Sequence, residues 1–129
     1  MSLDIPLLLE EHRTILAALD ELRRSGPGRP AGRDALRALR DLLVGHLARE
    51  DALLYPRLRE LARTRPHLRI LLDGFERETV ELGARVEAFF ARLEHEGEAL
   101  KLAGELGGLA ADLRQRIHRE EHVLYPELG

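Results

Sequence analysis

Four residues combine the chemistry of metal ligands with a position on the apolar face of a predicted helix. His46 and Glu50 are four residues apart, so a helix places both side chains on one face, about one turn apart. His12 and Glu120 occupy the same kind of position in the first and last helical patterns. Burying such groups is costly unless they pair or bind a metal ion. Imidazole and carboxylate together suit iron, so we expect His12, His46, Glu50 and Glu120 to be metal ligands.

The segment that contains Glu50 occurs twice in the chain. Residues 46–56 read HLAREDALLYP, and residues 116–126 read RIHREEHVLYP. Each copy ends a helical pattern at Tyr-Pro and carries a glutamate on the apolar face, but Arg116 replaces the histidine in the second copy. The second helical hairpin therefore repeats the first, and Thr79 takes the position that corresponds to His12.

The spacing of apolar residues predicts the helices that position these side chains. Apolar residues recur at steps of three and four over about residues 6–24, 33–54, 66–95 and 98–125. The stripes of the second and fourth helices are expected to include Leu53 and Val123. Pro56 is expected to end or kink the second helix, with a short helical connection over residues 56–65. These patterns predict an all-α, up-down-up-down four-helix bundle.

Composition limits the possible functions. A chain of 129 residues is long enough for one domain, so we interpret residues 1–129 as a single domain. The chain has no cysteine, so a metal site must use histidine and carboxylate, which suits iron, manganese or zinc. The net charge of −3 is small and its charges are dispersed, so nucleic acid is not an expected partner. No membrane span or signal peptide is visible, so we expect a cytoplasmic protein without a membrane partner.

The chain resembles the hemerythrin-like cation-binding (HHE) family over nearly its whole length. The resemblance is carried by His12, the His46–Glu50 pair, and Glu120, together with Tyr55-Pro56 and Tyr125-Pro126. It implies a four-helix bundle with a dinuclear iron centre, in which every helix supplies a histidine and the second and fourth helices supply bridging glutamates. It also implies binding or sensing of oxygen or iron, or repair of damaged iron centres.

Two positions depart from the family pattern, and both lie on the same half of the site. Thr79 stands where the third helix should supply a histidine, and Arg116 stands where the fourth should. We therefore expect a partly lost diiron site that binds one iron or similar cation, for sensing, storage or oxygen-related chemistry. The Arg116 guanidinium would replace the second metal by bridging Glu50 and Glu120. Thr79 is expected to fill core space and to bond a backbone carbonyl.

Other interpretations stay open. The chain could be a metal-free helical bundle that acts through contacts with an unknown protein partner, with Arg116 paired to the two glutamates. An enzyme is the least favoured function, because no nucleophile or redox cysteine is visible, and no catalytic residue is assigned. Tyr55 and Tyr125 are expected to pack at the bends before the prolines and to line the site without ligating. His118 and His122 lie about 200° from the ligand face and should form an exposed pair.

Overall fold

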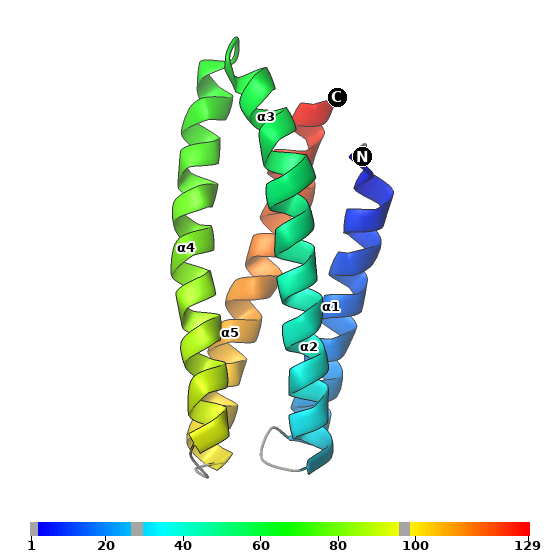
Figure 1. Ribbon diagram of the computed structural model, residues 1–129, viewed down its shortest axis with the longest axis vertical. Coiled ribbons are helices and arrows are strands. Elements are labelled where there is room, and N and C mark those ends of the chain that lie inside the picture. Colours follow the sequence, from blue (N-terminus) through cyan, green and yellow to red (C-terminus); the bar gives the residue numbers. More distant parts are fainter. Residues whose placement is uncertain (1–2, 27–29, 96–98) are drawn as a thin grey trace.

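The computed structural model describes residues 3–26, 30–95 and 99–129, and within them it is a helical bundle without strands (Figure 1). The long helices are α1 (Ile5–Ser25), α2 (Pro30–Arg49), α4 (Pro66–His95) and α5 (Ala99–Arg119), with a shorter α3 (Tyr55–Ala62). Two five-residue π-helical turns, the first π turn (Glu50–Leu54) and the second π turn (Glu120–Leu124), follow α2 and α5. A 3-10 turn (Tyr125–Leu128) completes the chain. The predicted up-down-up-down bundle is confirmed, and α2 continues through the first π turn into α3 (Figure 1).

Local signals set the ends of α1. The Asp4 side chain accepts a hydrogen bond from the Leu7 amide at 3.1 Å, which satisfies one of the free N–H groups at the start of the helix. At the other end, Gly26 has a φ of 82°, and its amide donates to the Leu22 carbonyl at 2.9 Å. A positive φ is easily adopted by glycine, so α1 ends there. The helix fixes the position of His12 near its middle.

Two apolar clusters fill the bundle, and the four buried histidines and glutamates come between them in the chain. One cluster includes Ile15, Leu43 and Leu113. The other includes Leu8, Leu54 and Leu124. His12, for example, stands between Leu8 of one cluster and Ile15 of the other. The candidate site is thus a polar layer that separates two apolar cores.

The two π turns shift which residues face the core. Leu54 and Leu124 are fully buried, whereas Leu53 is half-buried and Val123 is 46% exposed, so the predicted stripe positions Leu53 and Val123 are wrong. The reason is that the amide of Tyr55 donates to the carbonyl of Glu50, five residues back, and the second π turn repeats this bond. A π turn accommodates one extra residue, so the side chains that follow it are rotated relative to a regular α-helix.

Pro56 was expected to end or kink the second helix, and the structure shows that the helix does not end there. In a regular α-helix, its ring would clash with the carbonyl four residues earlier. The first π turn widens the helix immediately before Pro56, and α3 then continues to Ala62. The helix therefore passes the proline without a break, and residues 56–65 are largely helical, as predicted.

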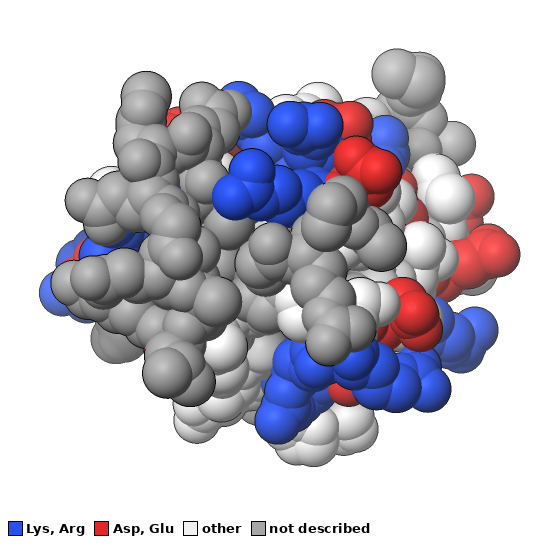
Figure 2. All heavy atoms as spheres, turned by 90° about the horizontal axis from the view of Figure 1, so that it is seen from below, with Lys and Arg blue, Asp and Glu red and all other residues white. Residues whose placement is uncertain are grey.

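Charged side chains of both signs share the surface of the bundle. Figure 2 views the molecule along its length and shows acidic and basic side chains next to one another on the described part of that end. Arg92 of α4 and Glu105 of α5 form one such pair, at 2.8 Å. Exposed pairs of this kind contribute little to stability.

No helix among the described residues combines the length and the apolar character needed to cross a membrane.

Candidate metal centre

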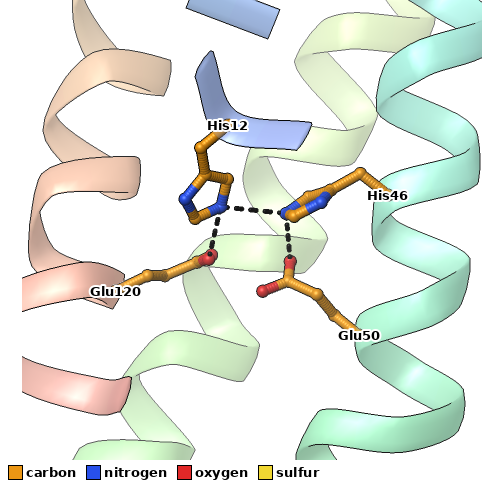
Figure 3. Close-up of side chains that lie close together, drawn as sticks. All are labelled: His12, His46, Glu50 and Glu120. Carbon is orange, nitrogen blue, oxygen red and sulfur yellow. Dashed lines mark hydrogen bonds and ion pairs between the residues drawn. The ribbon is translucent and has the colours of Figure 1, made fainter. Parts of the chain in front are cut away.

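Four buried side chains from four elements of the bundle converge on one point (Figure 3). His12 comes from α1, His46 from α2, and Glu50 and Glu120 from the two π turns. One ligand atom of each residue lies within 4.8 Å of the corresponding atom of every other. His12 Nε2 lies 3.0 Å from His46 Nε2 and 3.2 Å from Glu120 Oε2, and His46 Nε2 lies 3.2 Å from Glu50 Oε1. The structure thus brings together all four residues for which we predicted metal ligation.

The outer ring nitrogens of both histidines face carboxylates. His12 Nδ1 lies 2.7 Å from Glu121 Oε2, and His46 Nδ1 lies 3.1 Å from Glu11 Oε1. Ionised carboxylates only accept hydrogen bonds, so these contacts favour a proton on each Nδ1. The Nε2 lone pairs then point into the site, as in metal centres where carboxylates orient histidine ligands.

Glu11 and Glu121 were not among the site residues predicted from the sequence. Each is the direct neighbour of a predicted ligand, Glu11 beside His12 and Glu121 beside Glu120. Adjacent residues point in different directions on a helix, so a search restricted to one helical face passes over them. The only signal in the sequence is this adjacency, because the contacts of Glu11 with His46 of α2 and of Glu121 with His12 of α1 arise between helices.

The inner face of the site holds more acceptors than donors. With Nδ1 protonated on both histidines, His12 Nε2 and His46 Nε2 would direct two lone pairs at each other across 3.0 Å. Glu50 Oε1 is buried, and it has no hydrogen-bond donor among the described residues when His46 Nε2, 3.2 Å away, carries no proton. Such a group of acceptors requires protons or a cation. Two imidazole nitrogens and two carboxylate oxygens fit a divalent ion such as iron, manganese or zinc.

Protons can partly fill the role of a cation at this site. Burial, with the charge of Glu120 as a further contribution, raises the pKa of Glu50 to about 7. Burial works against ionisation of Glu120 as well, but hydrogen bonds with His12 and Glu50 and the charge of Arg116 outweigh it and lower the pKa of Glu120. Burial likewise opposes protonation of His46, yet the carboxylates of Glu50 and Glu11 raise its pKa overall. Without a metal, both Glu50 and His46 therefore hold a proton to a higher pH than they would in water.

Arg116 is buried beside the cluster and is well supplied with hydrogen-bond partners. Its Nε donates to Glu120 Oε1 at 3.0 Å, its Nη1 to the Phe75 carbonyl at 2.9 Å, and its Nη2 to the Tyr55 hydroxyl at 2.8 Å. The guanidinium also lies 4.7 Å from the centre of the Phe75 ring. The expected bridge from Arg116 to both glutamates is found only in part. Arg116 donates to Glu120, whereas the Glu50 carboxylate accepts from the Tyr125 hydroxyl. The Phe75 carbonyl and the Tyr55 hydroxyl accept from the two Nη groups of Arg116.

The other predicted lining residues also reach the site. The Thr79 hydroxyl donates to the Phe75 carbonyl at 2.8 Å, which confirms the expected backbone bond. The Tyr125 hydroxyl lies 3.2 Å from Glu120 Oε2 and 3.3 Å from Glu50 Oε2, so it can donate to one glutamate at a time. Burial raises the pKa of Tyr55 to about 12 and raises that of Tyr125 as well, so both hydroxyls keep their protons.

His118 and His122 lie outside this cluster. Both are exposed, and their rings stack with a centroid distance of 4.1 Å. His122 Nδ1 is 2.9 Å from the His118 carbonyl oxygen. The exposed histidine pair is therefore found as predicted, and it serves as a natural control for metal binding at the surface.

Comparison with known proteins identifies the family. A family model described as Hemerythrin HHE cation binding domain matches residues 3–128, which is nearly the whole chain. Neither the curated proteins nor the solved structures that were compared with the chain gave a match. The family match confirms the resemblance inferred from the histidines, the glutamates and the repeated Tyr-Pro.

Proposed function

Because the chain belongs to the hemerythrin HHE cation-binding domain family, we propose that it binds one iron ion, or a similar divalent cation, for sensing, storage or oxygen-related chemistry. The ligands would be His12, His46, Glu50 and Glu120. The observation that carries the proposal is the convergence of four buried acceptor atoms, one of them Glu50 Oε1 without a donor. A bound iron ion would supply one-electron redox chemistry.

The residues around the cluster support a single cation. Glu11 and Glu121 hold the two histidines by their outer nitrogens, and Tyr125 offers a hydroxyl to the glutamates. Arg116 places a permanent positive charge against Glu120 Oε1, which leaves less negative charge for a second cation. Thr79 already directs its hydroxyl to the Phe75 carbonyl. A second ion on this side would meet a cation rather than ligands.

Metal content after anaerobic ferrous loading tests this proposal. Tag-free wild-type protein should retain about one iron per chain after desalting, and parallel loading with manganese and zinc shows the preference of the site. His46→Ala should lose the ion, because it removes one of four ligands. His118→Ala is the matched control, since it removes an exposed histidine and should keep the metal. Retention by folded His46→Ala, or absence of metal from the wild type, would contradict the proposal.

A metal-free bundle that acts through protein contacts is the alternative. Two observations favour it: Arg116 neutralises Glu120, and the raised pKa of Glu50 allows that carboxyl to be protonated near neutral pH. A buried network of this kind need not stabilise the fold more than apolar packing would. In this case the loaded wild-type protein would contain no metal and would unfold identically with and without ferrous ion.

A further inference from the structure

An apolar cavity of about 130 Å³ adjoins the candidate metal centre on the side of α4. All four candidate ligands border it, as do Thr79 and Arg116. The rest of the wall is mainly aliphatic and comes from α1, α2, α4 and α5. Its aliphatic residues include Ile15, Leu43, Leu82, Val86, Leu113 and Ile117. The cavity is therefore a space between the helices, next to the polar layer but lined largely by carbon.

Thr79 and Arg116, the two hydrogen-bond donors on the border of this cavity that are not candidate ligands, direct their hydrogen bonds elsewhere. The Thr79 hydroxyl donates to the Phe75 carbonyl at 2.8 Å, and Arg116 donates to Glu120, Phe75 and Tyr55. The exposed surface of the cavity is consequently almost entirely apolar. Water gains little in such a space, because a buried water needs two to four polar partners.

The cavity extends to the surface between α2 and α4. Val44 of α2 forms part of its wall and is 60% exposed. Gly83 of α4 lies opposite in the same wall, and a Cβ atom built on Gly83 would meet no other atom within 4 Å. A small molecule can thus enter between these two helices, and the absence of a side chain at Gly83 leaves room for it.

We propose that this cavity binds one small, neutral, largely apolar molecule of about the size of benzene. The size follows from the volume, because an apolar cavity of roughly 150 Å³ in another protein stays dry and binds benzene. An anionic ligand is disfavoured, because the wall would remove its water while Thr79 and Arg116 already donate to protein acceptors, and the largely aliphatic wall favours an uncharged ligand. The inference goes beyond the proposed metal binding and does not require it. An occupied cavity would cover the side of the cluster that faces α4 and would keep water from it.

Binding of fluorobenzene to the metal-free protein tests the inference, with ¹⁹F NMR as the readout. We expect saturable binding of one molecule per chain to the full-length protein. Gly83→Leu should weaken this binding by at least about tenfold, which corresponds to about 1.4 kcal/mol, because the new side chain occupies the cavity. Gly74→Leu is the matched control: it makes the same change in α4, also in open space, away from the cavity wall. Both variants replace a helical glycine by a better helix former, so both should fold.

Three outcomes decide the matter. Binding that is lost in Gly83→Leu and kept in Gly74→Leu supports the proposed site. Absence of saturable binding to the wild type, or equal binding to both variants, overturns it. Saturable binding of 4-fluorobenzoate at the same site would overturn the neutral character of the ligand. Because the experiment uses metal-free protein, its failure leaves the ferrous-loading result unaffected, and the reverse also holds.

Discussion

The metal-free protein should become less stable as the pH rises from 5.5 to 8.5. Glu50 has a pKa of about 7 in the folded protein, against an ordinary value of 4.5. A carboxyl whose pKa is raised by folding favours the folded state when protonated. Its contribution is complete below pH 4.5 and disappears as the pH rises through 7. His46, whose pKa is also raised, changes stability in the same direction.

The size of the effect follows from these two values. The difference between about 7 and 4.5 corresponds to about 3.5 kcal/mol, since each pKa unit is worth about 1.4 kcal/mol. At pH 5.5 the unfolded chain has already lost most of this proton, so about 2 kcal/mol remains to be lost by pH 8.5. Glu11 and Glu120 have lowered pKa values and stay ionised over this range, so they do not change how the free energy of unfolding depends on pH.

Urea unfolding of chelator-treated protein, followed by circular dichroism at several pH values, measures this loss. Glu50→Gln is the matched control, because glutamine has nearly the same size and does not titrate. The stability of the variant relative to the wild type should increase by about 2 kcal/mol between pH 5.5 and 8.5. The variant also removes the carboxylate that raises the pKa of His46, which changes the difference in the same direction, whereas the exposed histidines cancel. Parallel curves for the two proteins would refute a raised pKa of Glu50.

Three further changes have defined outcomes. Arg116→Leu should cost about 3–5 kcal/mol in urea unfolding, because it leaves the Glu120 charge buried without its partner, and adding Glu120→Gln should recover part of the loss. Glu121→Gln should weaken metal binding by about 10–100-fold in competition with a chelator, because it changes the group that holds His12 Nδ1. Thr79→His combined with Arg116→His should raise iron capacity towards two per chain, and no gain in a folded double variant would contradict the placement of these two positions.

The bundle and the four-residue cluster could be predicted from the sequence because both depend on helical spacing. Apolar residues at steps of three and four define the core face, and a polar residue in such a stripe must lie inside the bundle. His12 and His46 were identified in this way, and the structure places their Nε2 atoms 3.0 Å apart. The repeated Tyr-Pro then related the two halves of the chain, which placed Glu120 opposite Glu50.

The remaining features depend on contacts between helices, which helical spacing does not encode. The partners of Arg116 were predicted in part only, because the Phe75 carbonyl and the Tyr55 hydroxyl compete for the same donors as Glu50. Glu11 and Glu121 lie off the apolar faces of their own helices and reach the site across a helix boundary. A prediction from the apolar pattern of each helix alone would place such residues at the surface.

The π turns connect the repeated sequence with the geometry of the site. Each begins at a candidate ligand, Glu50 or Glu120, and each is followed by Tyr-Pro. Since proline lacks an amide hydrogen and its ring clashes with an α-helical carbonyl, a wider turn before it allows the helix to continue. The tyrosine that follows each π turn points inward. The hydroxyl of Tyr125 reaches both glutamates, and that of Tyr55 reaches Arg116. Each Tyr-Pro pair therefore follows a turn that places its tyrosine against the site.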